Sequence, residues 1–266
     1  MAVKIVLTNQ KGGVGKTTTS GALAAGLGKK GFRVLAVDMD PQGNLGFSLG
    51  LDIEDGYTVY EVLNGEVTIR EAAEPADCCD VIPSNILLSE AELAFQRDNR
   101  ELILKNALFE VEEDYDYIII DTPPAFNILT LNAYAAADHL IIPMASEILS
   151  LVGLVQLKET VDAIRESVNP GLHVLGILLT RFNKRTNLSR DVLEMAQTIA
   201  EQTGSTVFDA KIRSGVAVAE APAHGLCILH YAPRSGPAQD YQAFVDEALR
   251  KMEAYQQLTG RVRVHG

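Results

Sequence analysis

The chain has 266 residues, with 35 acidic and 23 basic side chains and a formal net charge of −12. Its three cysteines are too few for a disulfide framework, and Cys78 and Cys79 are adjacent, so we expect a reduced, cytoplasmic protein. No apolar run reaches the roughly 18 residues of a membrane span, and an apolar strand rather than a signal peptide opens the chain.

Apolar strand-like segments alternate with helical patterns along the chain. This order predicts an α/β fold with a mostly parallel, twisted sheet and helices on both faces. We expect one domain over residues 1–258, with an insertion of short helices at 52–98 and a disordered tail at 259–266. The core strands are expected at 3–8, 33–38, 116–121, 138–143 and 172–180.

A glycine-rich loop follows the first of these strands and precedes an alanine- and leucine-rich helical run. Glycines let such a loop curl with its N–H groups inward, and the helix N-terminus adds partial positive charge. The Lys16 ammonium is then expected at the β- and γ-phosphates, with the Thr17 hydroxyl on Mg²⁺. Gln10 stands where the general phosphate-loop pattern has glycine, so the loop is a variant. The predicted nucleotide-binding residues are Lys11, Gly12, Gly13, Val14, Gly15, Lys16, Thr17 and Thr18.

Two further strands end in carboxylates. The strand at 33–38 leads into Asp38 and Asp40, and the strand at 116–121 ends in Asp121. Carboxyl ends of parallel strands meet at one sheet edge, so these groups can share a metal–phosphate site with the loop. A solvated turn opened by Asp40-Pro41 is the plain alternative for the first pair.

The segment Lys11–Thr17 resembles the deviant Walker A motif, KGGVGKT, of the ParA/MinD/Soj superfamily. The family order continues through Asp38–Asn44, the Walker B-like strand ending at Asp121, and Leu140–Met144. The likeness covers about residues 3–252 and is closest to the ParA/Soj branch. It implies a P-loop NTPase of the deviant Walker A type that uses ATP and Mg²⁺ and hydrolyses ATP slowly.

The resemblance also implies roles for individual residues. Lys11 would cross a dimer interface to the partner's phosphates, whereas Lys16 would serve its own subunit; the loop alone leaves a solvated Lys11 open. Asp40 would position the attacking water. The implied catalytic residues are Lys11, Lys16 and Asp40, and the implied metal-site residues are Thr17, Asp38 and Asp121.

Members of this branch bind DNA without sequence preference as ATP-bound homodimers and are stimulated by a ParB-like protein, which implies association with the nucleoid. Here Ser214 and Ala217 occupy positions that are basic in relatives, so a solvated basic loop is the alternative. A MinD-like or other cargo-positioning ATPase, acting on a membrane or protein scaffold, would share the nucleotide motifs. The candidate DNA-binding residues are Arg181, Lys184, Arg185, Arg190, Lys211 and Arg213.

The last helical pattern carries an apolar stripe that includes Tyr241, Phe244 and Met252. A membrane-lying helix needs a basic polar face, but residues 240–253 contain more acidic than basic side chains. We therefore expect this helix to pack on the sheet rather than attach to a membrane.

Overall fold

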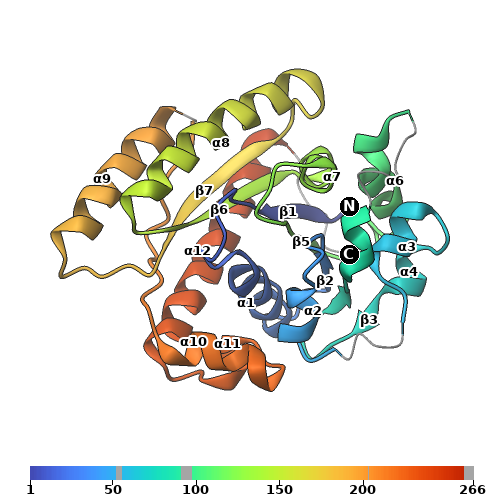
Figure 1. The fold of residues 1–266 in the computed structure, drawn as a ribbon, viewed down its shortest axis with the longest axis horizontal. Coiled ribbons are helices and arrows are strands. Elements are labelled where there is room, and N and C mark those ends of the chain that lie inside the picture. Colours follow the sequence, from blue (N-terminus) through green and yellow to red (C-terminus); the bar gives the residue numbers. More distant parts are fainter. Residues whose placement is uncertain (52–55, 91–97, 203, 261–266) are drawn as a thin grey trace.

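The computed structural model describes residues 1–51, 56–90, 98–202 and 204–260. Within these ranges a seven-stranded sheet runs in the order β3-β4-β2-β5-β1-β6-β7, and only the β3–β4 pair is antiparallel (Figure 1). The five predicted core strands are all present. The strands are β1 (Val3–Leu7), β2 (Val34–Asp38), β3 (Glu74–Pro75), β4 (Asp80–Ile82), β5 (Tyr117–Asp121), β6 (His139–Ala145) and β7 (His173–Thr180).

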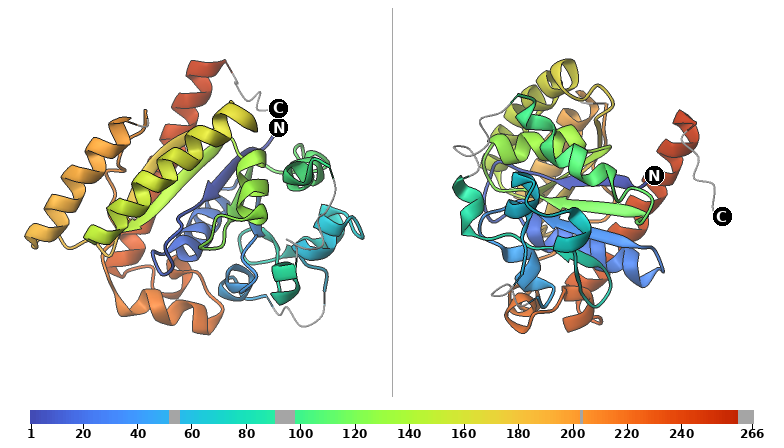
Figure 2. Two further views of the ribbon diagram at one scale, coloured as in Figure 1. Left: turned by 45° about the horizontal axis from the view of Figure 1, so that its top comes forward. Right: turned by 90° about the vertical axis from the view of Figure 1, so that its right-hand side faces the viewer.

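Helices cover both faces of the sheet, as predicted, because alternate strand residues point to two separate apolar cores. Helix α1 packs with α12 on one face, and α7 and α8 cover the other (Figures 1 and 2). The α-helices are α1 (Lys16–Lys29), α2 (Asn44–Ser48), α3 (Val59–Asn64), α4 (Ile69–Ala72), α6 (Ile103–Phe109), α7 (Ile128–Ala136), α8 (Ile148–Ser167), α9 (Asn187–Gln202), α10 (Val216–Glu220), α11 (Ile228–Tyr231) and α12 (Gly236–Thr259). The 3₁₀ helices are η1 (Ile86–Glu90), η2 (Arg100–Leu102) and η3 (Ala221–His224).

The described part of the predicted insertion contains short helices, and it also contains β3 and β4, which we did not predict. Capping boxes at Thr58 and Thr68 begin α3 and α4. Strand β4 is three residues long and β3 is two, so neither shows a readable alternation in sequence. Pairing with β2 defines β4 as a strand. Residues 52–55 and 91–97 of this segment lie outside the described residues.

Helix α12 packs its apolar stripe against α1 and the sheet, which confirms the predicted docking of this segment. Tyr241, Phe244 and Met252 are buried. Among the described residues, no helix has both the length and the apolar character needed to cross a membrane. Helix α12 ends at Thr259 with a left-handed Gly260, and the predicted tail beyond Gly260 lies outside the described residues.

The β3–β4 turn lies directly on α1 at Gly28. A Cβ at Gly28 would stand 1.8 Å from the carbonyl oxygen of Cys78, so no side chain fits there without moving the turn. We expect Gly28→Ala to lower the free energy of unfolding by about 1–3 kcal/mol, measured by urea denaturation. Gly153→Ala in α8 is the matched control, because a Cβ there meets nothing within 4 Å. The control should stabilise the protein by about 0.5–1 kcal/mol, and equal effects at both sites would contradict the close approach.

Candidate active site

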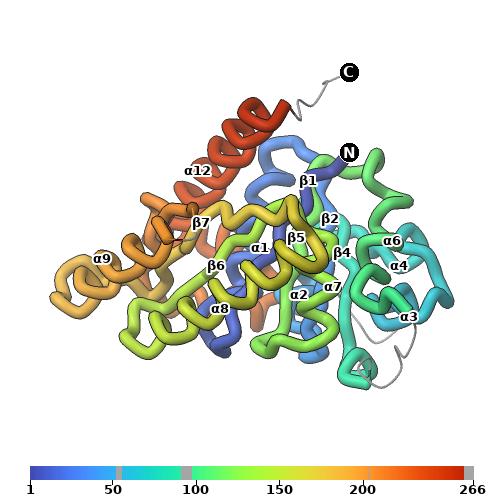
Figure 3. Tube along the Cα trace, turned by 90° about the horizontal axis from the view of Figure 1, so that it is seen from above, coloured from blue at the N-terminus to red at the C-terminus, as the bar shows by residue number. Residues whose placement is uncertain are grey.

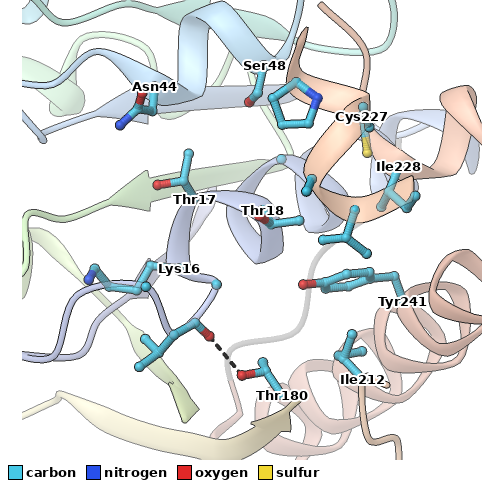
Figure 4. Close-up of a pocket in the computed structure, with 18 of the residues that line it drawn as sticks. Lys16, Thr17, Thr18, Asn44, Ser48, Thr180, Ile212, Cys227, Ile228 and Tyr241 are labelled. Atoms are coloured by element: carbon cyan, nitrogen blue, oxygen red, sulfur yellow. Dashed lines mark hydrogen bonds between the residues drawn. The ribbon is translucent and has the colours of Figure 1, made fainter. Parts of the chain in front are cut away.

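The loop between β1 and α1 has the backbone shape of a phosphate cradle. Gly13 and Gly15 have φ of 70° and 87°, a left-handed conformation that favours glycine. Gly15 begins α1 without a side-chain cap, so the helix N-terminus is open toward the loop. The Thr180 hydroxyl at the end of β7 donates to the Val14 carbonyl at 2.9 Å and fixes the loop from the side (Figure 4). The loop lines a cavity of about 630 Å³, within the size range of small-ligand sites.

Lys16 is held inside this loop. Its side chain is buried, and Nζ donates to the Lys11 carbonyl at 3.3 Å. Burial lowers the pKa of Lys16, while Asp121 and Asp40 oppose that shift. A desolvated ammonium in a glycine-rich loop at a helix N-terminus is suited to bind phosphate oxygens.

Asp121 ties the end of β5 to the first turn of α1. Its carboxylate accepts hydrogen bonds from the hydroxyls of Thr17 and Ser20, both at 2.7 Å. Burial raises the pKa of Asp121 to about 6, and the two hydroxyls and then Lys16 act in the opposite direction. Our sequence analysis missed Ser20, although it stands four residues after Lys16 and therefore on the same face of α1.

Asp38 lies beside Asp121, because β2 and β5 pair these two residues in register. Its oxygens accept the backbone N–H groups of Asp40 at 3.0 Å and Leu45 at 2.9 Å, so Asp38 shapes the turn that carries Asp40. Burial, and next the charge of Asp121, raises the pKa of Asp38 well above its usual range. Asp40 lines the cavity and accepts the Gln42 N–H at 3.0 Å.

Lys11 points away from its own loop. Its ammonium forms an ion pair with Glu147 at 2.6 Å and lies 3.4 Å from the Ser150 hydroxyl, at the start of α8. The hydrogen bond and charge of Lys11 lower the pKa of Glu147. The loop thus presents one lysine inward and one outward.

The far wall of the cavity is apolar and comes from the C-terminal part of the chain. Ile212, Ile228 and Tyr241 face the loop across the cavity (Figure 4). Such a wall suits the face of a nucleobase beside phosphates on the loop. These residues carry no motif, and only the fold brings them to the site.

The predicted basic residues come together on two adjoining loops and the first turn of α9, but they are not equally free to contact a ligand. The N–H of Phe182 donates to the carbonyl of Ile212 at 2.9 Å and joins the loops. Lys184, Arg185 and Arg190 are exposed around the start of α9, at one end of the molecule (Figure 3). Four of the side chains have partners within the chain: Arg181 lies 4.0 Å from Glu147, Arg213 pairs with both oxygens of Asp240 at 2.7 Å, Lys211 binds backbone carbonyls, and Arg190 donates to the side-chain oxygen of Asn187.

The residues present fit a Mg²⁺-nucleoside triphosphate. The amide-lined loop and buried Lys16 suit the phosphates, and the Thr17–Asp121 pair supplies the oxygen donors that Mg²⁺ prefers. A phosphate loop after β1, with carboxylates at the ends of β2 and β5, defines a P-loop nucleoside triphosphatase.

Comparisons with known proteins identify the family. Residues 2–174 match the AAA_31 family model, described as an AAA domain. The chain is 40% identical over 251 residues to the chromosome partitioning protein ParA of Myxococcus xanthus, covering 93% of this chain and 88% of that protein. It is 42% identical over 241 residues to the sporulation initiation inhibitor protein Soj of Bacillus subtilis, covering 89% and 94%.

A solved structure shares the fold over nearly the whole chain. Cobyrinic acid a,c-diamide synthase from Mycobacterium smegmatis, with bound ATP analogue and magnesium, superposes with a TM-score of 0.83 at 36% identity, covering 96% of this chain and 97% of that one. The chain belongs to the ParA/Soj family of ATPases.

The Asp38–Asp121 pair predicts a pH-dependent stability of the nucleotide-free protein. The pKa of Asp121 rises from the ordinary 3.8 to about 6, so between these values the folded protein holds a proton that the unfolded chain has lost. The free energy of unfolding should therefore fall as pH rises from about 4 to about 6, by on the order of 3 kcal/mol relative to Asp121→Asn.

Urea denaturation at a series of pH values measures this difference. Asp191→Asn, on the exposed surface of α9, keeps the buried pair and should follow the parent curve. Parallel curves for Asp121→Asn and the parent would show that the buried carboxyls do not titrate as proposed.

Proposed function

We propose that this ParA/Soj-family ATPase partitions DNA as an ATP-dependent homodimer that hydrolysis resets. The observation that carries the proposal is the pair of lysines in one loop: Lys16 is buried at its own phosphate site, and Lys11 points out beside α8. A lysine presented outward can serve the nucleotide of a second copy. Hydrolysis then depends on dimerisation.

Each residue of the site has a distinct task in this scheme. Lys16 and the loop amides bind the β- and γ-phosphates, and Thr18 lies at the α-phosphate. Thr17 and Asp121 hold Mg²⁺, which neutralises charge on the phosphates, while Asp38 supports this group and fixes the Asp40 turn. Asp40 orients the attacking water, and Lys11 of the partner copy stabilises charge that develops in the transition state.

The nucleotide state then controls DNA association. A ParB-like protein is the proposed activator of hydrolysis, and we place the protein in the cytoplasm on nucleoid DNA while it is dimeric. Exposed Lys184, Arg185 and Arg190 supply the phosphate contacts. Arg181 and Arg213 lie beside carboxylates, and Lys211 is partly buried against backbone carbonyls, so these three contribute less in this conformation.

DNA binding across a salt series, with ATP·Mg²⁺, ADP or no nucleotide, tests this function. We expect ATP-dependent, salt-sensitive binding, and Arg185→Ala should weaken it for all sequences and lower the salt slope by roughly 1. Lys105→Ala is the charge-matched control, because Lys105 is exposed on α6 at the opposite end of the molecule from α9 (Figure 3). An equal loss of DNA affinity in both variants would show that the basic residues around the start of α9 are not the DNA-binding site.

A protein-cargo positioning ATPase is the second candidate. The net charge of −12 opposes association with DNA, and the pairing of Arg213 with Asp240 reduces the basic surface open to it. An ATP-bound dimer that does not bind DNA at low salt would favour this second function over partitioning.

A further inference from the structure

The three cysteines of this chain lie close together beside the nucleotide cavity, which Cys227 also lines (Figure 4). Cys78 and Cys79 lie in the β3–β4 turn, and Cys227 precedes α11. With Asp77 and His230 they line a cavity of about 20 Å³. A cavity of this size holds roughly one water molecule or one ion.

Asp77, Cys78 and His230 each place a possible ligand atom within 4.8 Å of the other two. The Cys78 Sγ and His230 Nε2 atoms lie 3.6 Å apart. Tetrahedral Zn²⁺, bound about 2.3 Å from sulfur and about 2.1 Å from nitrogen, also separates its ligands by about 3.6 Å. The sulfur and nitrogen therefore already stand at the spacing that a tetrahedral ion requires.

Asp77 orients the imidazole for this task. Its carboxylate lies 3.0 Å from His230 Nδ1, on the opposite side of the ring from Cys78. A carboxylate at Nδ1 holds the proton on that nitrogen and leaves the Nε2 lone pair for a metal. The same arrangement of carboxylate, histidine and metal recurs in zinc proteins.

The surrounding structure fixes these side chains in place. The turn cannot move toward α1, because the Cys78 carbonyl lies against Gly28. The Lys29 ammonium at the end of α1 donates to the Leu229 carbonyl at 3.0 Å and holds α11 beside it. Chain segments far apart in sequence are thus brought together before any ion binds.

We propose that Cys78 and His230 bind a thiophilic divalent cation of the zinc class, with Asp77 as the residue that orients His230. Water completes the coordination, since Asp77 at the rim is exposed and Cys78 and His230 are only partly buried. The ion would bridge the β3–β4 turn and α11. This proposal does not depend on the proposed function.

Titration of the full-length, reduced, nucleotide-free protein with Co²⁺ tests the site. We expect a thiolate-to-cobalt charge-transfer absorption that saturates at one equivalent and disappears when Zn²⁺ is added. Cys78→Ala and His230→Ala should lose it, and Asp77→Asn should weaken Co²⁺ binding by about 10–100-fold. In a second readout, Zn²⁺ should raise the thermal unfolding temperature of the parent but not of Cys78→Ala.

Cys79→Ala is the matched control: Cys79 also lines the cavity, but its side chain is buried in the apolar core and its sulfur is not among the ligand atoms that lie within 4.8 Å of one another. It should keep the cobalt absorption, which also shows that a change in this turn does not by itself unfold the site. The proposal is overturned if Cys78→Ala gives the parent's absorption, or if the folded parent gives none.

Discussion

Replacing Lys11 by alanine is expected to lower steady-state ATP hydrolysis by at least about 100-fold while ATP binding to the monomer stays close to the parent value. The reason is the direction of the side chain: the Lys11 ammonium pairs with Glu147 and lies beside Ser150 at the start of α8, whereas the Lys16 ammonium lies within the loop. The substitution of Lys11 leaves the phosphate loop intact, but it removes a positive charge that we propose acts on the ATP of the partner copy. Hydrolysis is measured by phosphate release, and binding by a fluorescent ATP analogue.

The variant Lys16→Ala distinguishes the role of Lys16 from that of Lys11. Because Lys16 is buried within the loop, its removal should abolish both binding and hydrolysis. Normal hydrolysis by Lys11→Ala alone would exclude the proposed role across the dimer.

Asp40→Ala is expected to lower hydrolysis by about 100- to 10,000-fold and to leave a long-lived ATP-bound dimer. Asp40 lines the cavity on the turn that Asp38 fixes, and we propose that it holds the attacking water. ATP binding should persist, because the phosphate loop and the Thr17–Asp121 pair do not depend on this side chain.

Size-exclusion chromatography with ATP and single-turnover hydrolysis measure the two effects. Asp40→Asn is the conservative control, since its amide oxygen can still accept the Gln42 N–H that Asp40 accepts in the parent. It should fold as the parent does and hydrolyse as slowly as Asp40→Ala. If either variant hydrolysed ATP at the parental rate, Asp40 would not be the residue that positions the attacking water.

Sequence patterns predicted the framework of this molecule because its signals are local. The buried strands are mostly apolar runs, interrupted in β1 by Lys4, and the phosphate loop needs glycine where φ is positive, as at Gly13 and Gly15. The stripe of α12 follows from helical periodicity. Each signal lies within one segment and can be identified without the rest of the chain.

The missed features depend on contacts between distant segments. Strand β4 is defined by its pairing with β2, and the apolar wall at Ile212 and Ile228 reaches the loop only through the fold. The ion pair between Arg213 and Asp240 likewise leaves Arg213 less positive charge for a ligand than its residue type suggests. A pattern of residue types shows where charge exists, but not whether another side chain already neutralises it.

In the dimer that we propose, the ion pair between Lys11 and Glu147 limits the population of molecules that can pair. A copy whose Lys11 is held by its own Glu147 cannot offer that lysine to a partner, so the apparent dimer affinity falls by the fraction of copies in which Lys11 is free. Both side chains are more than one-third exposed, at 36% and 48%, and exposed pairs contribute less than about 1 kcal/mol. That energy corresponds to a factor of at most about five, which is small enough for ATP binding to overcome.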